Sequence, residues 1–347
     1  PVPLDERIVV HSGIGVASFA VTSAGDLVYL AGPPVSREKR RVIRLDRQGV
    51  EHPLPLPDAY YSHPRLSPDG KALVVMKCEG QSCKLFLCDL DRNVLSPFTS
   101  EPGNFFNPVF SPDGRRLAYS GFAIGAPTLF VKNIDGSGKA ERLTDAPTVE
   151  RGAAEFADSW SPDGRTLAYV AVANLVKSSV RAFARDIWLV SLDGKRERRP
   201  WFETPFTESA ASFSPDGRWM AYVSDESGRQ EVYVRPFPGP GGRFQISSNG
   251  GAEPIWTRGG REILYRHGRE FVAAGVRTDP DFAVGGAQVL FSGDYERGGR
   301  EDAPFEYAAS MDGHAIYVTQ AVPVPKPEYE LAIVTNWLQA IRASEQR

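Results

Sequence analysis

Short β-prone runs rich in apolar residues recur along the chain, and the same kind of turn separates them. The turn Ser-Pro-Asp-Gly occurs four times, at 67–70, 111–114, 161–164 and 214–217. An apolar residue precedes each copy, and a basic residue and a β-prone run follow it, as in 115–119. Pro presets φ at the second turn position, Asp bonds the nearby backbone, and Gly takes the φ > 0 that closes a hairpin. The pattern predicts a repeated strand-turn-strand unit.

Three weaker copies of the turn, at 22–25, 257–260 and 310–313, bring the total to seven. Successive copies are 43 to 53 residues apart, which suits a four-stranded propeller blade. Each unit has a third run that is β-branched and aromatic, and six units show a fourth. The last unit lacks its outer strand, and the run 6–11 at the other end of the chain reads as that strand.

We therefore predict an all-β fold, a seven-bladed β-propeller of four-stranded antiparallel blades closed by the N-terminal strand. A six-bladed ring, with one degenerate unit as an appendage, is the alternative. The repeats leave no long linker, so we expect a single domain over 1–347. The blade units are expected at about 14–58, 59–101, 102–147, 152–205, 206–248, 249–293 and 303–337, the last completed by 6–11.

Composition narrows the classes of partner. The net charge of −3 gives no electrostatic footprint for nucleic acid or an anionic membrane. No apolar run approaches the roughly 20 residues that cross a bilayer, so we expect no membrane insertion within the chain. The chain begins at Pro1 without an initiator Met, which we interpret as part of a longer polypeptide whose export signal or anchor lies outside it. We expect a monomeric propeller.

The three cysteines lie close together in one predicted hairpin. Cys78 and Cys83 flank its tip on facing strands, where a disulfide is geometrically possible and would favour an oxidising compartment. Three free thiols are the alternative, and Cys88 is left over in either case.

Polar residues recur where the innermost strands would begin around the propeller axis. Counting four residues back from each turn reaches His63, Asn107, Glu253 and Glu306, with Asp158 one step beyond its own position. Such a ring offers oxygen and nitrogen ligands for a divalent cation such as calcium. A hydrated, polar channel mouth explains the same residues, and both interpretations stay open. We expect no other cofactor.

The loops from second to third strands and from each blade to the next open on the same face as this ring. Long insertions on that face, at 145–155, 172–185 and 292–304, together with one hairpin tip, suggest a recognition surface. The candidate binding residues there are Gln81, Glu150, Arg151, Lys177, Arg181, Phe183 and Arg185.

The turns and the Asp-Ile-Trp of 186–188 resemble the propeller repeats of TolB and of prolyl-oligopeptidase-like peptidases. The stretches 224–239 and 250–256 look like the propeller region C-terminal to the kinase domain in bacterial receptor-type serine/threonine kinases. The resemblance implies a binding or sensing module outside the cytoplasm, with a cytoplasmic location as the alternative. The chain itself has neither the Gly-x-Ser-x-Gly of a serine hydrolase nor the glycine-rich loop and His-Arg-Asp of a kinase.

We therefore expect no catalytic residues and a non-enzymatic propeller that binds a protein, peptide or small ligand, as an extracytoplasmic sensor or interaction module of a larger protein. A metal-dependent hydrolase or lyase acting in the central channel is one alternative. A structural scaffold is the other.

Overall fold

The repeated turns each close an antiparallel hairpin, and the hairpins extend into sheets. The computed structural model describes residues 8, 10–11, 16–31, 38–122, 126–144, 154–172, 185–298, 305–323, 330–339 and 341. Within these residues there are six four-stranded sheets, one three-stranded sheet and one two-stranded ribbon. The all-β propeller of four-stranded antiparallel blades is confirmed. No helix in these ranges is long and apolar enough to cross a membrane.

The blades follow one another along the chain from β7 onwards. Blade 1 contains β7 (Tyr60–Leu66), β8 (Ala72–Glu79), β9 (Ser82–Asp89) and β10 (Val94–Pro97). Blade 2 contains β11 (Phe105–Phe110), β12 (Arg116–Gly121), β13 (Thr128–Asn133) and β14 (Glu141–Arg142). Blade 3 contains β15 (Ala154–Trp160), β16 (Thr166–Val172), β17 (Arg185–Ser191) and β18 (Arg198–Pro200).

Two further blades and the closing blade complete the ring. Blade 4 contains β19 (Glu208–Phe213), β20 (Trp219–Ser224), β21 (Glu231–Pro236) and β22 (Phe244–Gln245). Blade 5 contains β23 (Ala252–Thr257), the 3-10 turn η1 (Arg258–Gly260), β24 (Glu262–His267), β25 (Glu270–Arg277) and β26 (Ala283–Ser292). Blade 6 contains β27 (Tyr307–Ala309), β28 (Ile316–Ala321), β5 (Arg40–Leu45) and β6 (Glu51–Pro53).

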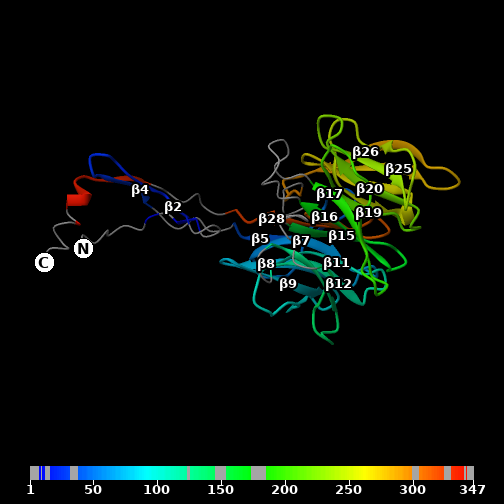
Figure 1. The fold of residues 1–347 in the computed structure, drawn as a ribbon, viewed down its shortest axis with the longest axis horizontal. Helices are drawn as coiled ribbons and strands as arrows, with labels where there is room; N and C mark the ends of the chain where they lie inside the picture. Colours follow the sequence, from blue (N-terminus) through cyan, green and yellow to red (C-terminus); the bar gives the residue numbers. More distant parts are fainter. Residues whose placement is uncertain are drawn as a thin grey trace.

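Blade 6 closes the ring with strands from both ends of the chain. Its inner strands, β27 and β28, come from the C-terminal part, and β5 and β6 come from the N-terminal part, with Val318 paired to Ile43. The innermost strands β7, β11, β15, β19, β23 and β27 each contact the next, and β27 contacts β7. The ring is therefore continuous with six four-stranded blades (Figure 1).

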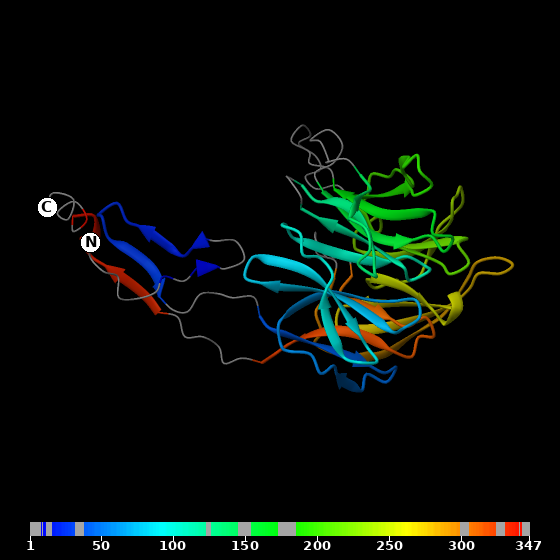
Figure 2. The ribbon, with the colours of Figure 1, turned by 90° about the horizontal axis from the view of Figure 1, so that it is seen from below.

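The seventh sheet has three strands and stands apart from the ring in both views (Figures 1 and 2). It contains β3 (Phe19–Val21), β4 (Leu27–Ala31) and β29 (Glu330–Val334) in the order β29-β4-β3, and we call it the small sheet. The ribbon of β1 (Val10–His11) and β2 (Val16–Ala17) precedes it in the chain. The appended unit is the arrangement considered above as the six-bladed alternative.

The closure differs from the prediction in its strand partners. The unit 14–58 was expected to keep its four strands together, but β4 pairs with β29, and β5 pairs with β28. The run 6–11 was expected to complete the last blade, but Ile8 forms a bridge with Ala31 of β4. The first and last units have thus exchanged third strands. The physical reason is that β27 and β28 belong to the ring, and pairing with β5 extends their sheet into a full blade.

The turn chemistry is the same in each intact copy. Ser111 Oγ donates to Asp113 Oδ1 at 2.5 Å and accepts from Arg116 N at 2.9 Å. Gly114 has φ of 69°, a left-handed conformation that glycine adopts without strain. Equivalent Ser-to-Asp bonds occur in the turns that begin at Ser67, Ser161, Ser214 and Ser310.

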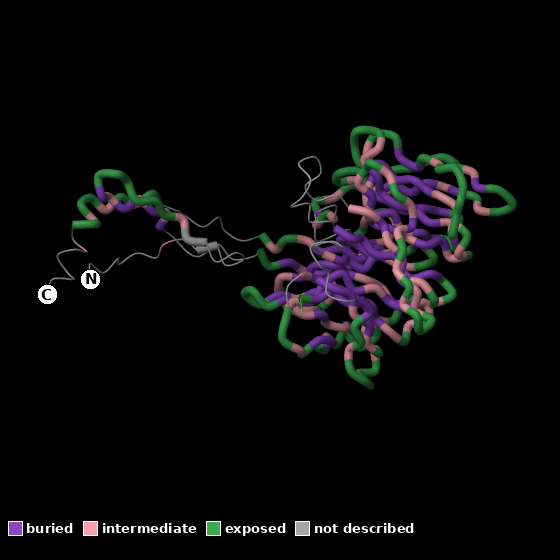
Figure 3. The backbone as a smooth tube through the Cα atoms, in the orientation of Figure 1, coloured by how far each residue is buried: buried purple, intermediate pink, exposed green. Residues whose placement is uncertain are grey.

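The core lies between adjacent blades rather than at one centre. Figure 3 shows buried positions running along the ring strands and exposed positions at the loops. Tyr119, Tyr169 and Tyr222 occupy the second strands of three successive blades and are at most 1% exposed. The rings of Tyr119 and Tyr222 meet aromatic neighbours edge-on, as Tyr222 does with Trp201 at 5.5 Å between centroids.

Candidate functional site

The innermost strands share a bulge at the position predicted to face the axis. The pairing register shifts there in blades 1 to 5. His63, Asn107, Ala210 and Glu253 lie at this position with φ between 47° and 59°. Positive φ is uncommon outside glycine, so its recurrence at one blade position is part of the architecture. Counting four residues back from each turn therefore reached the bulged, positive-φ residue in blades 1, 2, 4 and 5.

Three buried carboxylates of the predicted ring link blade 3 to blade 4, blade 5 to blade 6 and blade 6 to blade 1. Asp158 Oδ2 accepts from Ala211 N at 2.9 Å. Glu253 Oε2 accepts from Glu306 N at 2.7 Å, and Glu306 Oε2 accepts from His63 N at 3.0 Å. Each bond satisfies a backbone N–H of the neighbouring innermost strand, where an unpaired buried donor would be costly. These carboxylates therefore hold the blades together.

Burial sets the protonation of the channel. It raises the pKa of Asp158 and that of Glu306 to about 7 each. Burial, together with the positive charges of Arg65 and Arg40, lowers the pKa of His63 to about 3. His63 is therefore neutral at pH 7. Asp158 and Glu306 therefore change charge close to neutral pH.

The ring does not gather into a metal site. Within the described residues, no three His, Cys, Asp or Glu side chains are placed to hold a metal ion. Instead, polar atoms of the channel are left without hydrogen-bond partners in the described part of the chain: both ring nitrogens of His63, both amide atoms of Asn107 and Oδ1 of Asp158. Buried polar atoms without a hydrogen-bond partner in the protein typically bind ordered water or a polar ligand.

The loop-face candidates are only in part within the described residues. Gln81 is exposed at the tip of the β8–β9 hairpin, and Arg185 begins β17. Both lie on the face where the innermost strands begin. The other candidates lie outside the described residues: Glu150, Arg151, Lys177, Arg181 and Phe183.

The hairpin of blade 1 carries the disulfide considered above. Cys78 and Cys83 are direct cross-strand partners in β8 and β9, and they are joined with a Cα–Cα distance of 4.1 Å. Cys88 is free and buried, and burial raises the pKa of its thiol. The disulfide is adjacent to Gln81, so it braces a loop of the candidate face.

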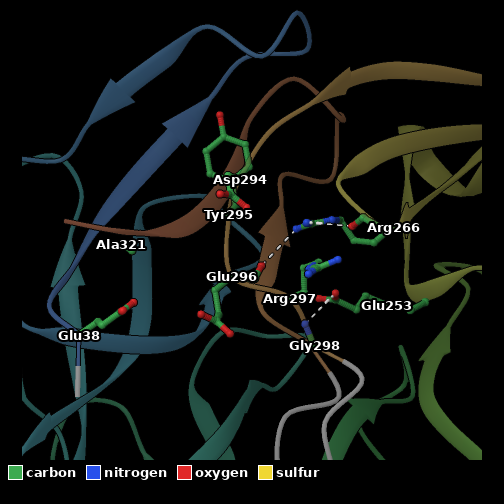
Figure 4. A pocket seen from close by; sticks show the side chains of 11 residues that line it. Glu38, Glu253, Arg266, Asp294, Tyr295, Glu296, Arg297, Gly298 and Ala321 are labelled. Carbon is green, nitrogen blue, oxygen red and sulfur yellow. Dashed lines mark hydrogen bonds between the residues drawn. The ribbon is translucent and has the colours of Figure 1, made fainter. Parts of the chain in front are cut away.

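A pocket on the same face was not anticipated from the sequence. It has a volume of about 570 Å³ and lies where blade 5 meets blade 6. Arg266 from the end of β24, Arg297 from the connection after β26, and Glu253 of the channel ring lie together on one side (Figure 4). The repeat pattern gives no signal for it, because the pocket depends on how one blade connection packs against two blades.

The comparisons with known proteins agree with this architecture. The family model described as the TolB beta propeller domain (PD40) matches residues 39–173 and 106–298, three quarters of the chain. The chain belongs to the TolB β-propeller family. The part of the chain that this model matches begins just before β5 and ends in the connection after β26.

Individual members of the TolB family support the assignment. A TolB homolog of Chlorobium luteolum is 27% identical over 170 residues, which cover 49% of this chain and 35% of that protein. The chain thus spans about a third of the length of this relative. The solved structure of a putative TolB from Agrobacterium tumefaciens has a TM-score of 0.63 at 18% identity, covering 83% of this chain and all of that one. The structure of TolB from Acinetobacter baumannii has a TM-score of 0.52 at 15% identity, covering 90% and 81%. These structural likenesses are to the fold.

Proposed function

We propose that this TolB-family propeller is a non-enzymatic module that binds a protein, peptide or small ligand on the face where the innermost strands begin. The observation that carries the proposal is the pocket of about 570 Å³ on that face. Its size falls within the range of ligand sites, roughly 300 to 1,000 Å³. The ring carboxylates, by contrast, bind backbone N–H groups between blades. These carboxylates therefore stabilise contacts between blades.

We also propose that the module acts outside the cytoplasm as a sensor or interaction unit of a larger protein, such as a receptor-type kinase. Two features support this. The resemblance of 224–239 to propeller regions of receptor kinases implies that context. The Cys78–Cys83 disulfide favours an oxidising compartment.

No observation on the described residues favours the hydrolase or lyase alternative. His63 is held neutral at pH 7, and Asp158, Glu253 and Glu306 each accept a backbone hydrogen bond from the next blade. A channel enzyme would need such groups free to contact substrate.

A matched pair of arginine substitutions tests the binding face. Arg185 begins the third strand of blade 3 on the proposed face, and Arg115 is exposed beside a turn on the opposite face. The immobilised full chain is used to capture partners from the extracytoplasmic fraction of the source cells. We expect Arg185→Glu to reduce capture severalfold and Arg115→Glu to leave it unchanged. Loss with Arg115→Glu alone would place binding on the other face, and capture of nothing by the native chain would favour a scaffold.

A further inference from the structure

The pocket between blades 5 and 6 contains a buried cation, Arg266, that forms no ion pair within the described residues. Arg266 is 2% exposed, and its guanidinium lies 4.2 Å from the centroid of the Phe271 ring. It donates only to the backbone carbonyls of Glu296 and Gly268, each at 3.3 Å, and its Nε has no partner among the described residues. A buried guanidinium is normally paired with an anion, because the desolvation of its charge is otherwise uncompensated. The side chain therefore has unused capacity to bind an anion.

A second arginine lines the same pocket. Arg297 is exposed on the connection after β26, and within the described residues it has no ion pair. Burial lowers the pKa of Arg266 most, the negative charge of Glu253 raises it, and the positive charge of Arg297 lowers it by a smaller amount. An anion placed between two guanidinium groups is attracted by both and offsets the repulsion between them.

The inner carboxylates of the pocket are already engaged. Glu253 accepts backbone hydrogen bonds from Gly298 N at 2.9 Å and from Glu306 N at 2.7 Å. Glu296 lies 2.6 Å from the guanidinium of Arg40. Neither carboxylate forms an ion pair with Arg266 in the described part of the chain. Neither carboxylate therefore accepts a hydrogen bond from the Nε of Arg266.

The outer part of the pocket has the opposite charge. Glu38 is exposed and lies across the opening from Arg266 and Arg297 (Figure 4). Asp294 also lies at the rim, where its side chain is 81% exposed and 3.8 Å from the guanidinium of Arg269. A ligand that interacts with the arginines and with Glu38 at the same time carries a negative and a positive group.

We propose that this pocket binds a zwitterionic ligand, whose carboxylate lies between Arg266 and Arg297 and whose amino group faces Glu38. The inference rests on the proposed function, because it assigns a ligand chemistry to the same face. Paired guanidinium donors match the planar, two-oxygen geometry of a carboxylate. A free amino acid and a peptide chain that ends in a basic residue both present this pair of charges, so the shared chemistry is an unblocked carboxylate beside an ammonium group.

Calorimetric titration of the purified full chain at low salt tests the proposal with three probes. These are free lysine, the peptide N-acetyl-Ala-Ala-Lys with a free carboxylate, and the same peptide ending in an amide. We expect at least one free-carboxylate probe to bind about tenfold or more tightly than the amide, since a charge-assisted hydrogen bond of this kind contributes at least that factor. Binding of lysine alone identifies a free amino acid as the source, and binding of the capped peptide identifies a chain terminus.

Variants assign the binding to the pocket. Arg297→Gln is expected to weaken the binding of the carboxylate probe about tenfold, and the fold should be preserved because the side chain is exposed. Glu38→Gln is expected to weaken it a few-fold, because solvent screens an exposed charge. Arg277→Gln, an exposed arginine at the far end of β25, serves as the matched control and should have no effect.

Three results would overturn the proposal: equal binding of the amide peptide, no binding of either carboxylate probe, or unchanged binding by Arg297→Gln. The titrations do not depend on the capture experiment with Arg185→Glu. Probe binding without partner capture would therefore contradict only the protein-binding form of the proposed function. Partner capture without probe binding would contradict only the zwitterion site.

Discussion

Ring blades and the small sheet share a design but differ in their neighbours. In each, a glycine-containing turn joins two antiparallel strands, and a third strand pairs alongside. In the ring, adjacent blades cover both sheet faces, and β16 is almost entirely buried. In the small sheet β3 is wholly exposed, and the side chains of Leu331 and Ile333 are 69% and 61% exposed. Local sequence therefore suffices to form the strands, but only the ring supplies the packing that buries them.

The buried side chains of the small sheet are covered by residues of the same unit. Leu27, Tyr29 and Ala31 of β4 are buried, and Trp337 and Val334 pack against them. This cluster covers one face of one strand. The comparison predicts that the stability of the chain is concentrated in the ring.

The largest difference should come from removing one ring aromatic. Trp256 is 3% exposed, and its indole Nε1 donates to Ser212 O of blade 4 at 2.9 Å. We expect Trp256→Ala to lower the free energy of unfolding by about 3 to 5 kcal/mol, through lost burial and the cavity left behind. Leu331→Ser in the small sheet should change it by no more than about 0.5 kcal/mol. Urea unfolding followed by fluorescence measures both, and similar losses in the two variants would contradict the comparison.

The next effect concerns the charge of the channel. In the folded chain the pKa of Asp158 is about 7, above its usual value of 3.8, so folding binds its proton more tightly. Stability from this group is therefore fully present below pH 4, falls as the pH rises from about 4 to about 7, and is constant above that. Asp158→Asn keeps an acceptor for Ala211 N and removes the titration.

We expect this variant to gain stability over the native chain as the pH rises from 4 to 8, by on the order of a few kcal/mol. Thermal unfolding at several pH values measures the difference. The turn aspartates, whose pKa values are lowered, act in the opposite sense but are common to both proteins. A difference between the two proteins that is independent of pH would contradict the assignment of a raised pKa to Asp158.

A smaller effect is expected at the disulfide of blade 1. Cys78 and Cys83 enclose a short loop, with a sequence separation of 5. Closing so short a loop restricts the unfolded chain by about 2 kcal/mol. We expect a Cys78→Ser and Cys83→Ser double variant to lose that amount in urea unfolding. Cys88→Ser is the control for losing a buried thiol, and no loss in the double variant would show that the link does not stabilise the ring.

The smallest effect compares two turns. Ser111→Ala in the ring removes the bonds to Asp113 and to Arg116 N and should cost about 1 kcal/mol. Thr22→Ala removes the bond from Asp26 N in the small sheet. It should leave the main unfolding transition unchanged, because that transition reports the ring. An equal effect of the two substitutions on the main transition would show that the small sheet unfolds together with the blades.

The repeats predicted much of the fold and the position of the bulge in the innermost strands. The turn spacing placed the strands, and the count back from each turn reached His63, Asn107 and Glu253, because the turn and the bulge are a constant distance apart in each hairpin. The chemistry of those residues was less predictable. Whether a channel carboxylate holds a metal or a neighbouring backbone N–H depends on how adjacent blades approach each other.

Strand partners and the pocket could not be read from the sequence. The third strands β5 and β29 are both short and each contains several apolar residues, so local propensity does not choose between β4 and β28 as their partners. Closure of the ring pairs β5 with β28 and leaves β29 to pair with β4. Arg266 likewise looks like an ordinary strand-end arginine until the connection after β26 covers it.

Cross-strand cysteine pairs test the closure most directly, in a background without the native cysteines. Arg41 and Gln320 are paired between β5 and β28, and Val28 and Ile333 are paired between β4 and β29. The account predicts that mild oxidation links each pair, Arg41→Cys with Gln320→Cys and Val28→Cys with Ile333→Cys, while the chain stays folded. Failure of both pairs to link in a folded chain would contradict the six-bladed ring and would show that the first unit keeps its four strands together.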